Sequence, residues 1–191
     1  MQTLFSLYIP KHFGEISILP KVLRDFLEQN TNTHFEITIS PGYLGEGAGF
    51  IKKASDIFLC HVGSLTIYRG MTSQERLVKS SQDFSSSLSV CVSHKITEND
   101  HRKMMFFRYS GNTEAILIGS SNFSKKTYFG KDKGEADLLL FYDDVICQYY
   151  RRMINEGGEY NSCVLSGSIA MRGEARQYLN AIYDEFINNA V

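Results

Sequence analysis

A chain of 191 residues is long enough for one well-buried domain and too short for two comfortable ones. Its 20 basic and 21 acidic residues give a formal net charge of -1, which argues against a general basic surface for nucleic acid. Four cysteines (Cys60, Cys91, Cys147 and Cys163) form no C-x-x-C pair. We therefore expect scattered buried thiols, no metal site, no cofactor and a cytoplasmic location. We also expect no signal peptide and no membrane-spanning segment.

In the first half of the chain, strand-like and helix-like periods alternate. In chain order we expect an edge strand over residues 3–9, a helix over 20–29, a strand over 34–40, a helix over 51–57, strands over 58–61 and 64–68, a helix over 72–84, and a strand over 88–92. Thr72 followed by Glu75 is typical of a capping box. The glycine-rich segment 41–49 lacks nucleotide-binding spacing, so we interpret it as a turn, with close backbone approach to a substrate as the alternative.

The stretch from His101 to Glu135 combines apolar strands with polar residues at their ends. It predicts a β-hairpin, a polar loop and a third strand beginning at Glu135. A helix over 144–155, a strand over 161–168 and a helix over 172–189 follow. Together the elements predict an α/β fold, a mixed β-sheet flanked by helices on both faces.

Five residues of the central stretch suit phosphoryl chemistry, which needs a nucleophile, a cation, neutral donors and a carboxylate that orients an imidazole. They are His101, Lys103, Ser120, Asn122 and Glu135. Strand period places His101 and Lys103 on one face, and likewise Ser120 and Asn122. Taken singly, His101 is typical of a surface histidine, and Ser120 and Asn122 are typical of turn caps.

His-x-Lys followed by Gly-Ser-x-Asn resembles the signature of the phospholipase D superfamily, and in particular its small nucleases and metal-independent restriction endonucleases. The run that begins Glu135-Ala136-Asp137 is similar to the segment that carries an acidic partner for the histidine in those nucleases. The core match covers about 35 residues, and a weaker pattern reaches back to about residue 34. The resemblance implies a phospholipase D-like fold over residues 1–191, with a catalytic core over about 34–142 and a helical part over about 143–191.

Two features depart from the family pattern. The full pattern has an aspartate five residues after the lysine, where this chain has Arg108. The interval from His101 to Ser120 is also a few residues longer than in compact members, with the extra length near Ser110, where insertion costs little. Arg108 leaves open a binding protein that kept the fold and lost turnover.

The resemblance also implies a mechanism and an assembly. His101 would attack phosphorus and form a phosphohistidine, while His101 of a second copy would act as the general acid. Lys103 and Asn122, helped by Ser120, would hold the phosphoryl oxygens without a metal. Glu135 would orient the imidazole, with Asp137 as the alternative. One His-x-Lys motif per chain then predicts a homodimer with one site across its interface.

We expect the substrate to be DNA, with RNA as an alternative, because no amphipathic segment has the basic polar face of a lipid-binding helix. Substrate contacts would come from basic residues near the site, namely Arg102, Arg108, Lys125 and Lys126. The sequence therefore predicts a metal-independent DNA endonuclease, for which restriction or phage attack on host DNA are the roles we consider. A non-nucleic phosphodiesterase or phospholipase remains the other enzymatic alternative.

Overall fold

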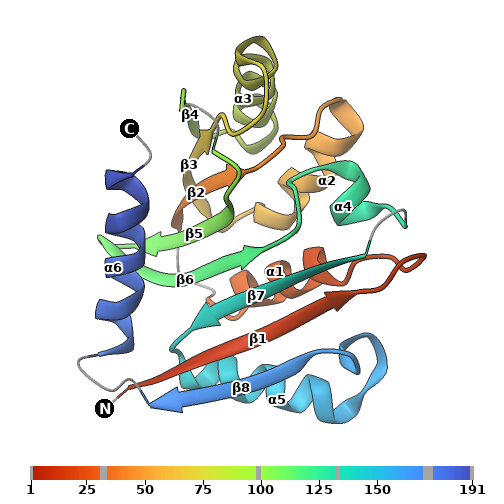
Figure 1. Cartoon of the computed structure of the whole chain (residues 1–191), viewed down its shortest axis with the longest axis vertical. Helices are drawn as coiled ribbons and strands as arrows, with labels where there is room; N and C mark the ends of the chain where they lie inside the picture. Colours follow the sequence, from red (N-terminus) through yellow and green to blue (C-terminus); the bar gives the residue numbers. More distant parts are fainter. Residues whose placement is uncertain (1, 31–33, 98–99, 132–133, 170–173, 190–191) are drawn as a thin grey trace.

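The computed structural model describes residues 2–30, 34–97, 100–131, 134–169 and 174–189, which form one mixed sheet flanked by helices (Figure 1). Its strands are β1 (Thr3–Lys11), β2 (Phe35–Pro41), β3 (Val62–Tyr68), β4 (Cys91–Lys95), β5 (Lys103–Tyr109), β6 (Asn112–Gly119), β7 (Glu135–Phe141) and β8 (Val164–Ile169). Its helices are α1 (Leu19–Glu28), α2 (Ala48–Phe58), α3 (Gln74–Leu88), α4 (Lys125–Phe129), α5 (Asp144–Glu156), the 3-10 turn η1 (Gly158–Tyr160) and α6 (Ala175–Asn188).

The eight strands lie in the order β4-β3-β2-β5-β6-β7-β1-β8. Strands β2, β3 and β4 run parallel, and the other neighbouring pairs are antiparallel. Strand β1 pairs with both β7 and β8, so the predicted edge position of residues 3–9 is wrong. Its buried residues Phe5, Leu7 and Ile9 alternate with more exposed ones, which suits an interior strand with one well-covered face.

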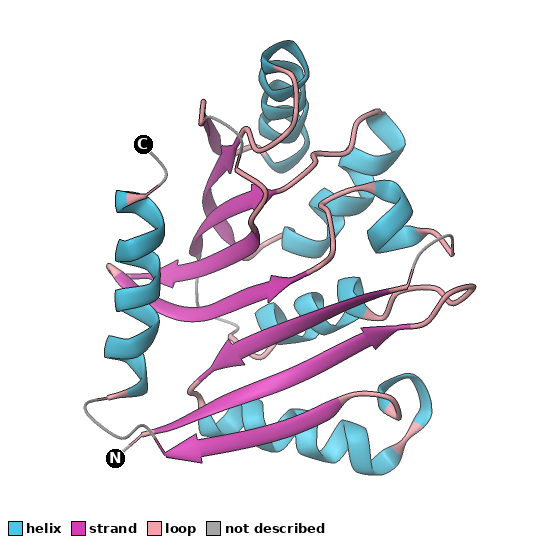
Figure 2. Cartoon of the chain, in the orientation of Figure 1, coloured by secondary structure: helices cyan, strands magenta, loops and turns pink. Residues whose placement is uncertain are grey.

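The two faces of the sheet are covered unequally (Figure 2). The first face carries the larger core, in which residues of β1, β2, β5 and β7 pack with α1, α2, α3 and α5. On the second face, α6 lies against β6 and closes a smaller core through Ala175, Leu179 and Phe186. The predicted α/β fold with helices on both faces is confirmed.

Several predicted boundaries are wrong because buried side chains extend the helices. Phe58 belongs to α2, where it is buried one turn after Ala54, and not to a strand over 58–61. Helix α3 starts after Ser73, whose hydroxyl caps Arg76 N–H, so Thr72 is not the cap. Helix α3 continues through Ser85 to Leu88, and β4 follows at Cys91.

The central hairpin, the third strand and the helix after it form as expected. Helix α5 begins after Asp143, whose carboxylate accepts two backbone N–H groups, and ends before Gly157 at a φ of 79°. Helix α4 lies in the segment between the hairpin and the third strand, where we expected a polar loop. Of the helix expected over 172–189, residues 172 and 173 lie outside the described part of the chain.

The four cysteines are free thiols, as expected, but only Cys147 and Cys163 are buried. Cys60 and Cys91 are exposed, which corrects the expectation for these two. Among the described residues, no helix has the length and apolar character that crossing a membrane requires.

Candidate active site

Antiparallel pairing of β5, β6 and β7 brings the predicted polar residues to one end of the sheet. Strand β5 begins at Lys103, β6 ends at Gly119, and β7 begins at Glu135. Gly119 is in register with Asp137, and Lys103 is in register with Pro41 of β2. Strand pairing therefore places the motif residues at neighbouring strand ends, although they come from separate parts of the sequence.

Lys103 and Asn122 meet at Gly42, in the turn after β2. A methyl group added to Gly42 would lie 2.9 Å from both Asn122 Oδ1 and Lys103 Cγ, so these two side chains are neighbours. Gly42 has a φ of +61°, which favours glycine. The Tyr43 N–H donates to Asn122 Oδ1 at 3.0 Å, so the amide nitrogen of Asn122 is left to donate. Their closeness at Gly42 brings together two of the predicted site residues, Lys103 and Asn122.

His101 lies two residues before the start of β5 and is exposed. The ammonium group of Lys103 donates to the backbone carbonyl of His101 at 3.2 Å. Within the described ranges, the imidazole of His101 makes no hydrogen bond or ion pair with another residue. The side chain is therefore accessible to a substrate.

The residues on either side of His101, Asp100 and Arg102, contact each other and neighbouring elements. The carboxylate of Asp100 accepts from Arg102 Nε at 2.9 Å and from Ser40 Oγ at 3.0 Å. The guanidinium group of Arg102 lies 4.4 Å from the ring centre of Phe186 on α6. Burial raises the pKa of Asp100, but hydrogen bonds from Arg102 and Ser40 outweigh it and hold the pKa below its ordinary value. These contacts link the residues on both sides of His101 to β2 and α6.

Ser120 is tied to the neighbouring strand. Its hydroxyl oxygen accepts from Ala136 N at 2.9 Å and donates to Ala136 O at 3.3 Å. Its exposed side chain thus fixes the end of β6 against β7. These hydrogen bonds indicate a role in positioning the turn after β6 more directly than a role in substrate contact.

The two carboxylates considered for the imidazole have different surroundings. Glu135 is half-buried, and its side chain makes no hydrogen bond or ion pair with any described residue. Asp137 is buried and accepts from Ser121 Oγ at 2.5 Å and from Ser121 N at 3.3 Å. Burial raises the pKa of Asp137 from 3.8 to about 6, against the lowering effect of these bonds, and Glu135 raises it further. Because Asp137 is hydrogen-bonded to Ser121, Glu135 is the carboxylate that is left without a hydrogen-bond partner among the described residues.

The four basic residues expected to touch substrate fall into two groups. Arg102 is paired with Asp100, and Arg108 lies 3.5 Å from Glu36 and stacks 4.1 Å over Tyr183 of α6. Lys125 and Lys126 are exposed on α4, which follows the Asn122 turn. The two arginines are held within the chain, while the two lysines face solvent.

Three residues near the site carried little or no signal in the sequence. Gly42 lies in a segment interpreted as a turn, with close backbone approach to a substrate as the alternative. Asp100 is an ordinary turn residue by pattern, and Ser121 stands at the unspecified position of Gly-Ser-x-Asn. Their roles depend on partners that are far away in sequence, such as Asn122 for Gly42 and Asp137 for Ser121. Asp137, which the sequence offered only as an alternative partner for the imidazole, was the one sign of a second carboxylate at this place.

Comparison with known proteins gives matches among solved structures alone: no protein-family model and no curated protein matches the chain. The chain is similar to the phospholipase D family member Nuc from Salmonella typhimurium, with 14% identity, a TM-score of 0.46, and coverage of 85% of this chain and 99% of Nuc. For NucT from Helicobacter pylori the values are 12%, 0.45, 84% and 98%. For a mutant of yeast tyrosyl-DNA phosphodiesterase they are 12%, 0.43, 71% and 46%. None of the three reaches a TM-score of 0.5, so the function must be decided by the side chains of this chain.

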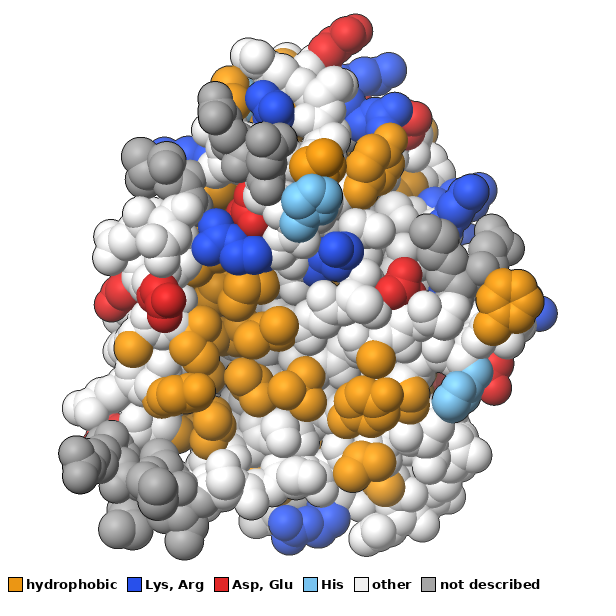
Figure 3. All heavy atoms as spheres, viewed as in Figure 1, with side chains coloured by type: hydrophobic (Ala, Val, Ile, Leu, Met, Phe, Trp, Pro, Cys, Tyr) orange, Lys and Arg blue, Asp and Glu red, His pale blue; other side chains and the backbone are white. Residues whose placement is uncertain are grey.

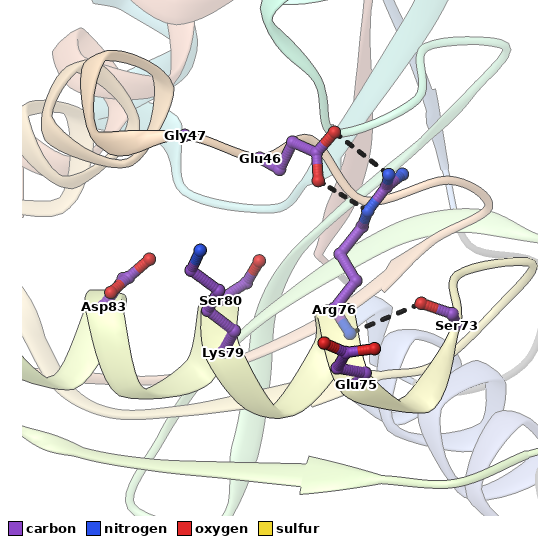
Figure 4. Close-up of a pocket in the computed structure, with 8 residues that line it drawn as sticks. All are labelled: Glu46, Gly47, Ser73, Glu75, Arg76, Lys79, Ser80 and Asp83. Carbon is purple, nitrogen blue, oxygen red and sulfur yellow. Dashed lines mark hydrogen bonds and ion pairs between the residues drawn. The ribbon is translucent and has the colours of Figure 1, made fainter.

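A hollow of about 360 Å³ lies between the start of α2 and helix α3 (Figure 4). Arg76 extends across it and pairs with Glu46 at 2.8 Å, and its guanidinium group also lies over the ring of Tyr43. The lining carries the acidic residues Glu46, Glu75 and Asp83 and the basic residues Arg76 and Lys79. This mixed charge does not select for an anion. The site at Lys103 and Asn122 is the stronger candidate for phosphate chemistry.

Proposed function

We propose that this protein is a metal-independent phosphodiesterase that cuts DNA through a covalent phosphohistidine. The observation that carries the proposal is the meeting of Lys103 and Asn122 at Gly42, with the Lys103 ammonium group bonded to the backbone of His101. A cation, an amide donor and an accessible imidazole in one place match the needs of phosphoryl transfer. These residues also carry the His-x-Lys and Gly-Ser-x-Asn motifs that resemble those of the phospholipase D superfamily.

In the first step, an imidazole nitrogen of His101 attacks phosphorus. A nitrogen–phosphorus bond forms while the bond from phosphorus to the departing oxygen breaks. His101 of a second copy donates a proton to that oxygen, so the leaving group departs as a neutral hydroxyl. Lys103 and the Nδ2 group of Asn122 offset the negative charge on the remaining phosphoryl oxygens.

In the second step, water attacks the phosphohistidine. The second histidine, now neutral, takes a proton from the water, and the nitrogen–phosphorus bond breaks to regenerate His101. Glu135 is the carboxylate we assign to the imidazole, because Asp137 is already engaged by Ser121. A carboxylate in this position keeps the reactive tautomer and stabilises the charged ring.

The need for a second histidine is met by a homodimer, and the uneven cover of the sheet supports it. Figure 3 shows apolar side chains gathered over the sheet beside α6. On this face Tyr8 and Val164 are exposed by 43% and 55%. Met104, three residues after His101, is also only partly buried there. An apolar surface next to the nucleophile suits a twofold interface that places two copies of His101 across one site.

Nucleic acid is the substrate we propose because basic side chains remain available beside the site despite the net charge of -1. Lys125 and Lys126 are exposed on α4, close in sequence to Asn122. They can contact phosphates on either side of the one that is cut. DNA is our first choice and RNA the alternative.

The proposal is tested by plasmid cleavage with purified protein in excess EDTA. We expect nicking or cutting by the natural chain, loss of at least about a thousandfold for His101→Ala, and normal activity for His94→Ala, an exposed histidine outside the motif. Cleavage that requires Mg²⁺ and survives His101→Ala would overturn the proposed mechanism.

A further inference from the structure

Asp137 lies beneath the turn that carries the motif serine and asparagine. Its side chain is 5% exposed and belongs to the first face of the sheet, the same face as the large core. Oδ2 accepts from the hydroxyl of Ser121, and Oδ1 accepts from the backbone N–H of Ser121. Both carboxylate oxygens are therefore directed at one residue, which stands between Ser120 and Asn122.

Gly119 makes room for this carboxylate. A methyl group added to Gly119 would lie 1.9 Å from Asp137 Oδ1 and 2.6 Å from the carbonyl oxygen of Ala136. A side chain at position 119 would therefore displace Asp137 from Ser121. The glycine that opens the Gly-Ser-x-Asn motif is required here by the buried aspartate opposite it.

A small cavity continues from Asp137 toward the candidate site. Its volume is about 10 Å³, and its lining includes Ser40, Lys103, Ser121, Tyr128 and Asp137. A space of this size is enough for about one water molecule. The buried carboxylate and the stem of Lys103 thus border the same space.

We infer that Asp137, acting through Ser121, is a positioning residue that sets the Gly119–Asn122 turn and holds the Asn122 amide beside Lys103. This inference rests on the proposed function, in which Lys103 and Asn122 hold the phosphoryl oxygens. Asp137 does not touch the reacting atoms, so its effect reaches them through the turn. The ionised carboxylate accepts two hydrogen bonds from Ser121, whereas the protonated group must donate from one oxygen, and the Ser121 hydroxyl must then turn to accept.

The charged and titratable groups around Asp137 define how its protonation responds. Tyr128 of α4 and Lys103 of β5 border its cavity, and Glu135 lies two residues earlier on β7. Lys11, at the end of β1, donates to the carbonyl oxygens of Lys126 and Thr127. Loss of the Ser121 hydroxyl removes a hydrogen bond that lowers the pKa of Asp137, so protonation would begin at higher pH.

The test measures the pH profile of kcat/KM for DNA cleavage in Asp137→Asn and Ser121→Ala. We expect Asp137→Asn to lose about tenfold in kcat/KM at pH 7.5 and to lose the part of the acid limb that titrates near pH 6. Ser121→Ala should move that limb to higher pH. Asp25→Asn, which alters another buried carboxylate bonded to hydroxyl groups, should leave the limb in place.

A second measurement does not depend on cleavage. In a His101→Ala background, the backbone amide resonances of Ser121 and Asn122 should titrate with a midpoint near pH 6 and cease to do so when Asp137→Asn is added. An unchanged pH limb, or amide titration that persists without the carboxyl group, would overturn the inference. Amide titration as expected, in a protein that cuts no DNA, would instead reject the proposed function and retain the positioning role.

Discussion

The pKa values of two buried aspartates near the site are shifted in opposite directions. Burial raises the pKa of Asp137 from 3.8 to about 6, whereas hydrogen bonds from Arg102 and Ser40 outweigh burial at Asp100 and lower its pKa. The folded chain therefore holds a proton on Asp137 between these pH values that the unfolded chain has lost. The opposite applies to Asp100, whose hydrogen bonds favour the charged form.

This difference predicts opposite pH effects on stability. Asp137 stabilises the folded state fully below pH 3.8, and this contribution is lost as the pH rises through about 6. As the pH rises from 4 to 7, the natural chain should lose roughly 2 kcal/mol of unfolding free energy relative to Asp137→Asn, which lacks the titrating group. Relative to the natural chain, Asp100→Asn should lose stability as the pH rises toward 3.8, because the charged form of Asp100 stabilises the fold fully above that pH and this contribution is lost at lower pH. Urea unfolding at several pH values measures both, and slopes of the same sign would contradict this assignment.

Gly42 offers a test of how closely the site is packed. In Gly42→Ala the new methyl group must displace Asn122 Oδ1 or Lys103 Cγ, so we expect DNA cleavage to fall by about tenfold or more. Gly14→Ala is a matched control, since Gly14 also has a positive φ, of +87°, but its added methyl group meets no described atom within 4 Å. Both variants should lose about 1 kcal/mol of stability from backbone strain. Equal cleavage by the two variants would argue against a functional role for the contact at Gly42.

At the level of single residues, the sequence pointed to the proposed site residues more readily than to the residues that support them. His101, Lys103 and Asn122 were proposed because their types and spacing suit phosphoryl chemistry. Ser121, Asp100 and Gly42 act through partners brought close by strand pairing, and no local pattern records such a partner. The proposal that Arg102 and Arg108 contact substrate did not anticipate that both arginines stack on aromatic residues of α6.

At the level of secondary structure, the proposed dimer depends on the part of the second face that α6 leaves uncovered. Helix α6 covers β6, and apolar side chains beside it remain partly exposed on β1, β5 and β8. A surface of this kind is typical of an interface. His101, the proposed nucleophile, precedes β5, which contributes to this face.

Tyr8→Glu should weaken self-association. A buried charge in an apolar interface is costly, so we expect the dimer dissociation constant to rise by at least about tenfold, with cleavage lost at concentrations where the monomer dominates. Val145→Glu is the matched control, because Val145 is exposed by 66% on α5, a helix of the first face. Sedimentation over a dilution series measures the change. A dimer that resists Tyr8→Glu and dissociates with Val145→Glu would place the interface elsewhere.

Helix and strand positions followed from the sequence where apolar periods were long and uninterrupted. The hairpin, β7, α1 and α5 formed as expected because each has a clear period and defined ends. Errors arose where tertiary packing extended an element, as for Phe58 in α2 and the serines of α3. Pairing of β1 with both β7 and β8 involves long-range contacts that local alternation does not specify.

For the whole molecule, the proposed site lies at one end of the sheet, and the chain as a whole is close to neutral. A net charge of -1 provides little long-range attraction for the proposed DNA substrate, so we expect its affinity to come from a few local contacts, including Lys125 and Lys126. The mixed character of the sheet was predictable from alternating elements and one hairpin. The order of its eight strands was not, because neighbours such as β2 and β5 are separated by two other strands in the chain.

The central claim is that His101 forms a covalent bond to phosphorus, and trapping that intermediate tests it most directly. Labelled DNA would be mixed with the protein in EDTA, quenched in alkaline detergent, and the labelled peptide identified by mass spectrometry. We predict a nucleotide adduct on His101 that is absent in His101→Ala and present in His94→Ala. Cleavage at the normal rate with the adduct on another residue, or with full activity in His101→Ala, would contradict this mechanism.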